Sequence, residues 1–124
     1  MTIQKSKLQG NHGEELVARA LQEQGFKILA RNYTSRQGEI DIVAYKKNLI
    51  IFVEVKTRSA NYFDLSEVIT HRKQHNIINT AKQFIAKHDY ENVSYRFDVA
   101  LLEPNHDGIL SISYLSDAFR ENEL

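Results

Sequence analysis

Three residues in the middle of the chain have the types and spacing that metal-dependent hydrolysis requires. Asp41 lies in the segment EIDIVAY, and Glu54 and Lys56 lie in the segment LIIFVEVK. Side chains on a strand alternate between its two faces, so Glu54 and Lys56 share one face. By the same rule Ile40 and Ile42 share the face opposite to Asp41. Two carboxylates can bind Mg²⁺, and a lysine beside them can polarise a metal-bound water or neutralise charge on a phosphate.

Whether these three residues meet depends on the turn between the two predicted strands. Lys46, Lys47 and Asn48 separate the strands, which indicates a hairpin. A turn of two or four residues places Asp41 directly opposite Glu54, with their Cβ atoms roughly 4.5–5.5 Å apart. A turn of three residues sends the two side chains to opposite faces.

Two interpretations of the hairpin are open. Like charges directly opposite each other destabilise a sheet by about 0.2–1 kcal/mol, and a divalent cation between them would reverse the sign of that interaction. Alternatively, the polar face is simply solvated, and Glu39 pairs with Lys56 across the strands. The other residues on this face favour the first interpretation, because charges on a partly buried face need partners or a metal. They are Val43, Tyr45, Ile50 and Phe52.

The hairpin belongs to a predicted order α-β-β-β-α-β-β, which is typical of an α/β fold with a mixed central sheet flanked by helices. Apolar spacing predicts two helices, 11–24 and 70–88, the second with Thr70 as its N-cap. The predicted strands are 26–33, 39–45, 49–56, 94–102 and 109–115. We expect a single domain over 1–124, with 1–10 and 117–124 loosely ordered.

The composition of the 124 residues is that of an ordinary globular domain, with 42% hydrophobic and 26% charged residues. Cysteine is absent, which excludes disulfides and thiolate metal sites and leads us to expect a cytoplasmic protein. No apolar run approaches the roughly 18 residues of a membrane span, so we expect no membrane partner. The formal net charge of zero argues against nucleic-acid binding, although basic residues cluster locally, as in 71–75.

Several further motifs accompany the hairpin in a fixed order along the chain. They are Gly13-Glu14-Glu15-Leu16, Arg31-Asn32-Tyr33, Gly38-Glu39-Ile40-Asp41, Phe52-Val53-Glu54-Val55-Lys56, Thr70 with Lys73, and Arg96-Phe97-Asp98-Val99. This ordered set closely resembles the YraN-like family of small bacterial proteins, which is grouped with the PD-(D/E)XK nucleases and particularly with archaeal Holliday-junction resolvases. One departure is that Ile40 replaces the proline before the first acid.

The resemblance implies a restriction-endonuclease-like fold and a nuclease that uses Mg²⁺, with Mn²⁺ as a substitute. It implies that Asp41 and Glu54 bind the metal and that Lys56 is the catalytic lysine. Val55 would bind the metal through its backbone carbonyl, and Glu14 would be an additional acid at the site.

For the accessory residues, structural roles compete with functional ones. Glu14 is also suited to interact with the dipole of its helix, and Lys73 can be a solvated helix residue. Arg96 and Asp98 share a strand face and can form a structural pair rather than bind a ligand.

The leading hypothesis is a magnesium-dependent nuclease acting on DNA, in particular branched or structured DNA. The branched substrate and a homodimeric state rest on the resemblance alone. Basic residues on the rim of the site would contact phosphates, namely Arg36, Arg58, Arg72 and Lys73. The alternatives are a nucleic-acid-binding or scaffold protein that keeps the fold without activity, and a purely structural interaction domain.

Overall fold

The computed structural model describes residues 2–4, 9–57 and 68–121. Its helices and strands are, in chain order, β1 (Thr2–Gln4), α1 (Gln9–Glu23), β2 (Lys27–Thr34), β3 (Glu39–Lys46), β4 (Leu49–Thr57), α3 (His71–His88), β5 (Ser94–Pro104) and β6 (Ile109–Phe119). Arg58, expected on the rim of the site, lies outside the described residues.

Six strands form one mixed sheet in the order β1-β6-β5-β4-β3-β2. Strands β4 and β5 are parallel, and the other neighbouring strands are antiparallel. The predicted α/β class and the order α-β-β-β-α-β-β, expected of a restriction-endonuclease-like core, are confirmed from α1 onwards.

The first and last strands of the described chain, β1 and β6, are neighbours in the sheet. Thr2–Gln4 forms the short strand β1 against β6, and β6 itself continues to Phe119. Parts of the two segments for which loose order was expected, 1–10 and 117–124, are therefore paired strands. The physical reason is that strand pairing satisfies backbone N–H and C=O groups that an open sheet edge leaves unpaired.

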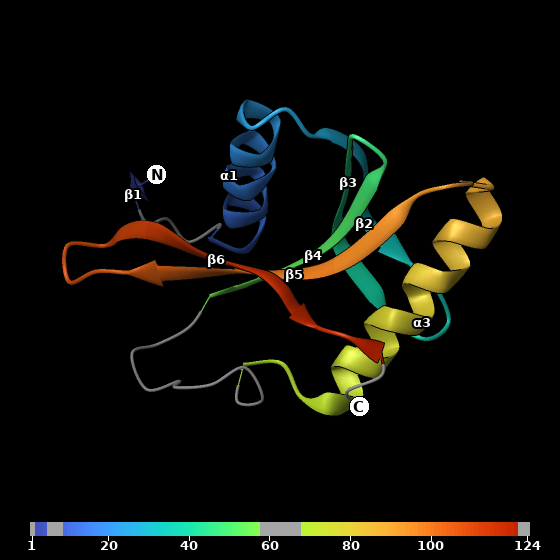
Figure 1. Ribbon diagram of the computed structural model, residues 1–124. Coiled ribbons are helices and arrows are strands. Elements are labelled where there is room, and N and C mark those ends of the chain that lie inside the picture. The colour runs from blue at the N-terminus through green and yellow to red at the C-terminus, as the bar shows by residue number, and fades with distance from the viewer. Residues whose placement is uncertain (1, 5–8, 58–67, 122–124) are drawn as a thin grey trace.

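The two helices cover opposite faces of the sheet (Figure 1). Strand β4 lies between them and has an almost continuous apolar sequence. Its residues Ile50 and Phe52 pack toward α3, whereas Ile51 and Val53 pack toward α1. A strand that is buried on both faces needs apolar residues at every position, which explains why this part of β4 shows no polar alternation.

The turn between β3 and β4 has two residues, which is one of the lengths that the sequence left open. Lys47 and Asn48 have φ angles of 50° and 64°, as a type I′ turn requires. Lys46 then pairs with Leu49, and this register continues to the pair Ile42 and Val53. The predicted register, in which Asp41 lies opposite Glu54, is therefore confirmed as far as the neighbouring pair, Ile42 and Val53.

The alternation of β3 is interrupted at Asp41, which corrects one expectation. Ile40 packs in the cluster on the α3 side, whereas Ile42 packs on the α1 side, so the two do not share a face. The interruption coincides with Asn32 on β2, which has a φ of 52° and lies between the paired residues Arg31 and Tyr33. A left-handed residue breaks the regular pleat, and the period-two rule then fails locally.

Candidate active site

Asp41 and Glu54 lie in one cleft between the sheet and the start of α3. The cleft has a volume of about 420 Å³. Its lining residues come from the β3 region, β4 and α3, and they are Gly38, Glu39, Asp41, Glu54, Thr70, Arg72, Lys73, Asn76 and Ile77. The carboxylates of Asp41 and Glu54 therefore face the same space, on the side of the sheet covered by α3.

Glu54 is the buried acid of this cleft, with only 5% of the residue exposed. Its Oε2 atom lies 2.8 Å from Nζ of Lys73. Burial, followed by the hydrogen bond and the negative charge of Asp41, raises the pKa of Glu54 to about 8, and Lys73 only partly opposes this shift. Without a cation, the ionised form of Glu54 is therefore disfavoured in the cleft.

Asp41 is held by the backbone of the neighbouring strand. The N–H of Val55 donates to Oδ2 of Asp41 at 2.8 Å. This bond lies just beyond the last β3–β4 pair, Ile42 with Val53, so the side chain of Asp41 replaces a main-chain partner where the ladder ends. It fixes the orientation of the Asp41 carboxylate in the cleft. The predicted role of the Val55 carbonyl stays a prediction.

Among the described residues, the lysine that contacts Glu54 is Lys73, in the first turn of α3. The hydroxyl of Thr70 caps this helix as predicted, because its Oγ1 accepts from the backbone N–H of Lys73 at 3.2 Å. The hydrogen bond to Glu54 raises the pKa of Lys73. Lys73 is therefore more than a solvated helix residue, although it does remain half-exposed.

Lys56 is half-buried near the end of β4, where it pairs with Leu101 of β5. Within the described part of the chain, no hydrogen bond or ion pair joins Lys56 to Asp41, Glu54 or Glu39. The alternative cross-strand pair of Lys56 with Glu39 is therefore not formed. The catalytic role of Lys56 stays a prediction.

Glu14 approaches the same region from α1. Its side chain is 16% exposed and lies 3.9 Å from the guanidinium of Arg31. Burial, and then the charge of Asp41, raises the pKa of Glu14, while Asn32 and Arg31 oppose the shift. The first turn of α1 contains no acid, so a helix-dipole role for Glu14 is not supported.

The other rim residues occupy different positions. Arg72 lines the cleft from α3. Arg36 is exposed in the turn before β3 and is not one of the described lining residues. The sequence prediction missed Glu39 and Asn76 as lining residues, because only the packing of α3 across β3 brings them to the cleft.

Gly38 allows this close packing. A Cβ atom at this position would lie 3.1 Å from Cβ of Asn76 and 3.4 Å from its carbonyl oxygen. The same approach brings the hydroxyl of Ser35 to within 2.8 Å of that of Thr80. The segment before β3 thus packs directly against α3, beside the cleft that Gly38 and Asn76 line.

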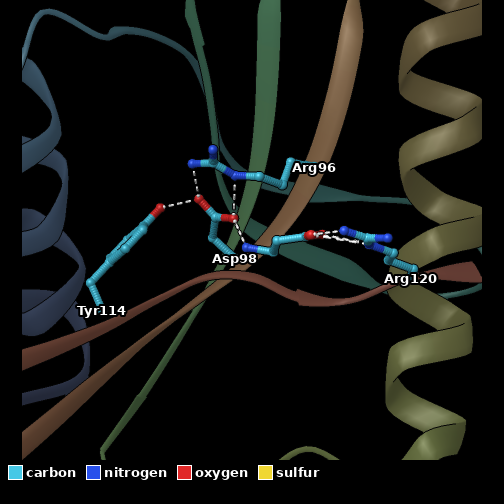
Figure 2. Close-up of polar contacts among 5 residues, drawn as sticks. Arg96, Asp98, Tyr114 and Arg120 are labelled. Carbon is cyan, nitrogen blue, oxygen red and sulfur yellow. Dashed lines mark hydrogen bonds and ion pairs between the residues drawn. The ribbon is translucent and has the colours of Figure 1, made fainter. Parts of the chain in front are cut away.

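Arg96 and Asp98 form the structural pair that was one of the two expectations for them. Asp98 is fully buried, and Arg96 donates two hydrogen bonds to it at 2.8 and 2.9 Å. Figure 2 shows Tyr114 reaching the same carboxylate, with its hydroxyl 2.6 Å from Oδ2. The backbone N–H of Asp117 completes the set at 2.8 Å, at a bulge where β6 has a φ of 55°.

This network lies on the other face of the sheet from Glu54. Asp98 alternates with Val99, which packs on the α3 side, and shares its face with Ala100, which packs on the α1 side. Two of the four hydrogen bonds that Asp98 accepts come from Arg96 on the same strand, and the other two, from Tyr114 and the N–H of Asp117, join β5 to β6, so Asp98 belongs to the scaffold.

A single divalent cation would have two carboxylates available in the cleft. Among the described residues, no group of three or more His, Asp or Glu side chains is arranged to hold a metal ion. Asp41 and Glu54 nevertheless fit Mg²⁺, which is commonly bound by one or two carboxylates with water and phosphate oxygens completing the octahedron.

The family comparison places the chain among known sequences. The family model described as "Uncharacterised protein family UPF0102" matches residues 13–102. The chain belongs to UPF0102. A UPF0102 protein of Caldicellulosiruptor saccharolyticus is 40% identical over 112 residues, covering 89% of this chain and 95% of that protein. A UPF0102 protein of Treponema pallidum is 41% identical over 120 residues, covering 94% and 95%. The resemblance noted in the sequence motifs is thus confirmed at the level of the family.

Among solved structures, that of SfsA from Pyrococcus furiosus in complex with Ca²⁺ is similar to this UPF0102 chain. The sequence identity is 16% and the TM-score is 0.45. The similarity covers 89% of this chain and 63% of SfsA, so the chain spans less than two thirds of that protein. As for membranes, no helix in the described ranges is both long enough and apolar enough to span a bilayer.

Proposed function

We propose that this chain is a metal-dependent nuclease that hydrolyses phosphodiester bonds of DNA with Mg²⁺ as its cofactor. The observation that carries the proposal is that Asp41 and the buried Glu54 line the same cleft. Two carboxylates in this position repel each other when both are ionised, and a divalent cation is the ligand that would remove the repulsion.

Each residue of the cleft has a role in this proposal that follows from its contacts. Asp41 and Glu54 would hold the cation, with Asp41 oriented by the N–H of Val55. Bound Mg²⁺ would activate a water and stabilise charge on the phosphate. Lys73 pairs with Glu54 and lines the cleft, where its ammonium could instead form an ion pair with a phosphate oxygen of the substrate.

The substrate is proposed from charge and access. Arg72 and Lys73 project from the first turn of α3 and line the cleft, so an anionic backbone can approach both of them and the acid pair together. Specificity for branched or structured DNA, and action as a homodimer, extend the proposal by family analogy only.

A nucleic-acid-binding protein without activity is the second candidate. The observation that favours it is the ion pair of Lys73 with Glu54, because a lysine can satisfy a buried carboxylate without any metal. In this candidate, the basic residues bind DNA and the acid pair only shapes the cleft.

The test combines metal titration with DNA binding and cleavage. Titration calorimetry with Mn²⁺ and Mg²⁺ should detect one site in the wild type and none in Glu54→Gln. Cleavage of linear and branched DNA should require the metal. Lys56→Ala should abolish cleavage while most DNA affinity remains, if the predicted role of Lys56 is correct. Binding of DNA without any cleavage in Mg²⁺ or Mn²⁺ would select the second candidate.

The contribution of α3 is tested with a matched pair of lysines. Lys73 and Lys82 are both on α3, are 48% and 47% exposed, and are both paired with a glutamate. Lys73→Ala should reduce cleavage and DNA affinity, whereas Lys82→Ala should change neither. Arg58→Ala with Arg72→Ala should flatten the salt dependence of binding, because each phosphate that these residues no longer neutralise reduces the logarithmic slope by roughly 0.9. A wild type that binds no nucleic acid at low salt would refute both candidates.

A further inference from the structure

Asn32 joins two motifs that are far apart in the sequence. With its amide oriented to satisfy its neighbours, its side-chain nitrogen lies 3.1 Å from Oε1 of Glu14 and 3.2 Å from Oε1 of Glu39. Glu14 comes from α1 and Glu39 from the first position of β3. One amide therefore links two carboxylates that neither helix nor strand pairing would otherwise hold together.

The backbone of Asn32 is as unusual as its contacts. Its φ of 52° puts it in the left-handed region, where asparagine is tolerated better than most other residues. The pairing of β2 with β3 passes from Arg31 and Ile42 to Tyr33 and Ile40, so Asn32 stands at the level of Asp41. The conformation turns the amide out of the regular pleat and toward the two acids.

Arg31 reinforces this arrangement from the preceding position. Its guanidinium lies 3.2 Å from Oε2 of Glu15 and 3.9 Å from Oε1 of Glu14. Arg31 and Asn32 therefore fasten the acidic part of α1 to the sheet. Gly13 permits the same approach, because α1 contacts the buried Leu102 directly at this position.

We propose that Asn32 is a positioning residue that holds Glu14 and Glu39 together beside Asp41, so that Glu14 acts with Asp41 on the proposed metal. The effect of Asn32 on metal binding rests on the proposed function, but its contacts with Glu14 and Glu39 can be tested without a metal. Groups that orient the ligands of a metal usually contribute about 10–100-fold to metal affinity.

The first measurement is of the contacts alone, in metal-free protein. The side-chain amide signals of Asn32, recorded by ¹H–¹⁵N NMR, should shift in Glu14→Gln and in Glu39→Gln, while those of Asn92 should stay unchanged. Asn92 is a suitable reference because it also has a left-handed φ, of 57°. Unchanged Asn32 signals in both variants would overturn the proposal, whether or not the protein binds metal.

The second measurement is of Mn²⁺ affinity by calorimetry. Asn32→Gly keeps the left-handed backbone accessible and removes only the amide, and we expect it to weaken Mn²⁺ binding by about tenfold. Asn92→Gly is the matched control and should bind as the wild type does. If Asn32 acts through Glu14, the double variant of Asn32→Gly with Glu14→Gln should bind no more weakly than Glu14→Gln alone.

Additive effects in this double variant, or an unchanged affinity in Asn32→Gly, would overturn the proposal. A wild type that binds no Mn²⁺ would instead refute the proposed function. The NMR measurement would then still decide whether Asn32 positions the two acids.

Discussion

Replacing Glu54 by glutamine tests the central physical claim about the cleft, that an ionised Glu54 destabilises the metal-free protein. Burial and the neighbouring Asp41 raise the pKa of Glu54 from 4.5 to about 8 in the folded state. An acid whose pKa is higher in the folded state binds more protons there than in the unfolded state. The free energy of unfolding therefore falls as the pH rises from about 4.5 to about 8.

The size of the effect follows from the displacement of the pKa. Each unit of displacement of the pKa changes the free energy of unfolding by about 1.4 kcal/mol, so this free energy falls by at most about 5 kcal/mol between pH 4.5 and pH 8. Glutamine carries no charge, and the Glu54→Gln variant should lack this fall. Removing the ion pair with Lys73 offsets less than about 1 kcal/mol, because the ammonium of Lys73 is half-exposed.

The assay is urea unfolding in the presence of a chelator at pH 5, 7 and 9. We expect the two proteins to differ little at pH 5, and Glu54→Gln to be the more stable by several kcal/mol at pH 9. Glu91→Gln, an exposed glutamate in the loop after α3, is the control and should follow the wild type. If the stabilities of wild type and Glu54→Gln run parallel across this pH range, the reasoning about the buried acid pair is refuted.

Three further predictions follow from the same contacts. Asp41→Asn should leave the free energy of unfolding unchanged or slightly raised without metal, because asparagine can still accept from the N–H of Val55, and it should abolish metal binding. A large loss of stability in urea unfolding would assign Asp41 a structural role instead. Gly13→Ala should lower the free energy of unfolding by about 1–3 kcal/mol, because the added Cβ overlaps the buried Leu102, and wild-type stability would contradict the packing of α1 described above. Asp98→Asn should cost about 3–5 kcal/mol by leaving buried donors unpaired, and unchanged Mn²⁺ affinity by calorimetry should separate this scaffold network from the cleft.

The hairpin of the acid pair could be predicted because its determinants are local. The strand-sized apolar segments of β3 and β4, and two residues able to adopt left-handed conformations at the turn, are visible in a short stretch of sequence. The same holds for the start of α3, where a threonine cap is followed by an amphipathic pattern. With a turn of two or four residues these features place Asp41 opposite Glu54, and the turn of the structure has two.

The period-two rule failed at one place, and the failure has a local cause that the sequence does not reveal. Ile40 and Ile42 pack on different faces of the sheet at the level where Asn32, on the neighbouring strand, adopts a left-handed conformation. Asparagine tolerates this conformation but does not require it. The sequence alone therefore identifies Asn32 only as part of a motif.

Short-range propensity and patterning in the sequence specify the elements from α1 to β6 and the hairpin that carries Asp41 and Glu54, whereas the two-residue turn that sets the hairpin register is seen in the structure. Which lysine contacts Glu54 was decided by the tertiary structure. Lys73 reaches the carboxylate only because α3 packs closely against the segment at Gly38, whereas Lys56, next but one to Glu54 in sequence, makes no such contact among the described residues. Contacts between distant segments depend on how side chains fill the space between helix and sheet, and that packing is a property of the whole core.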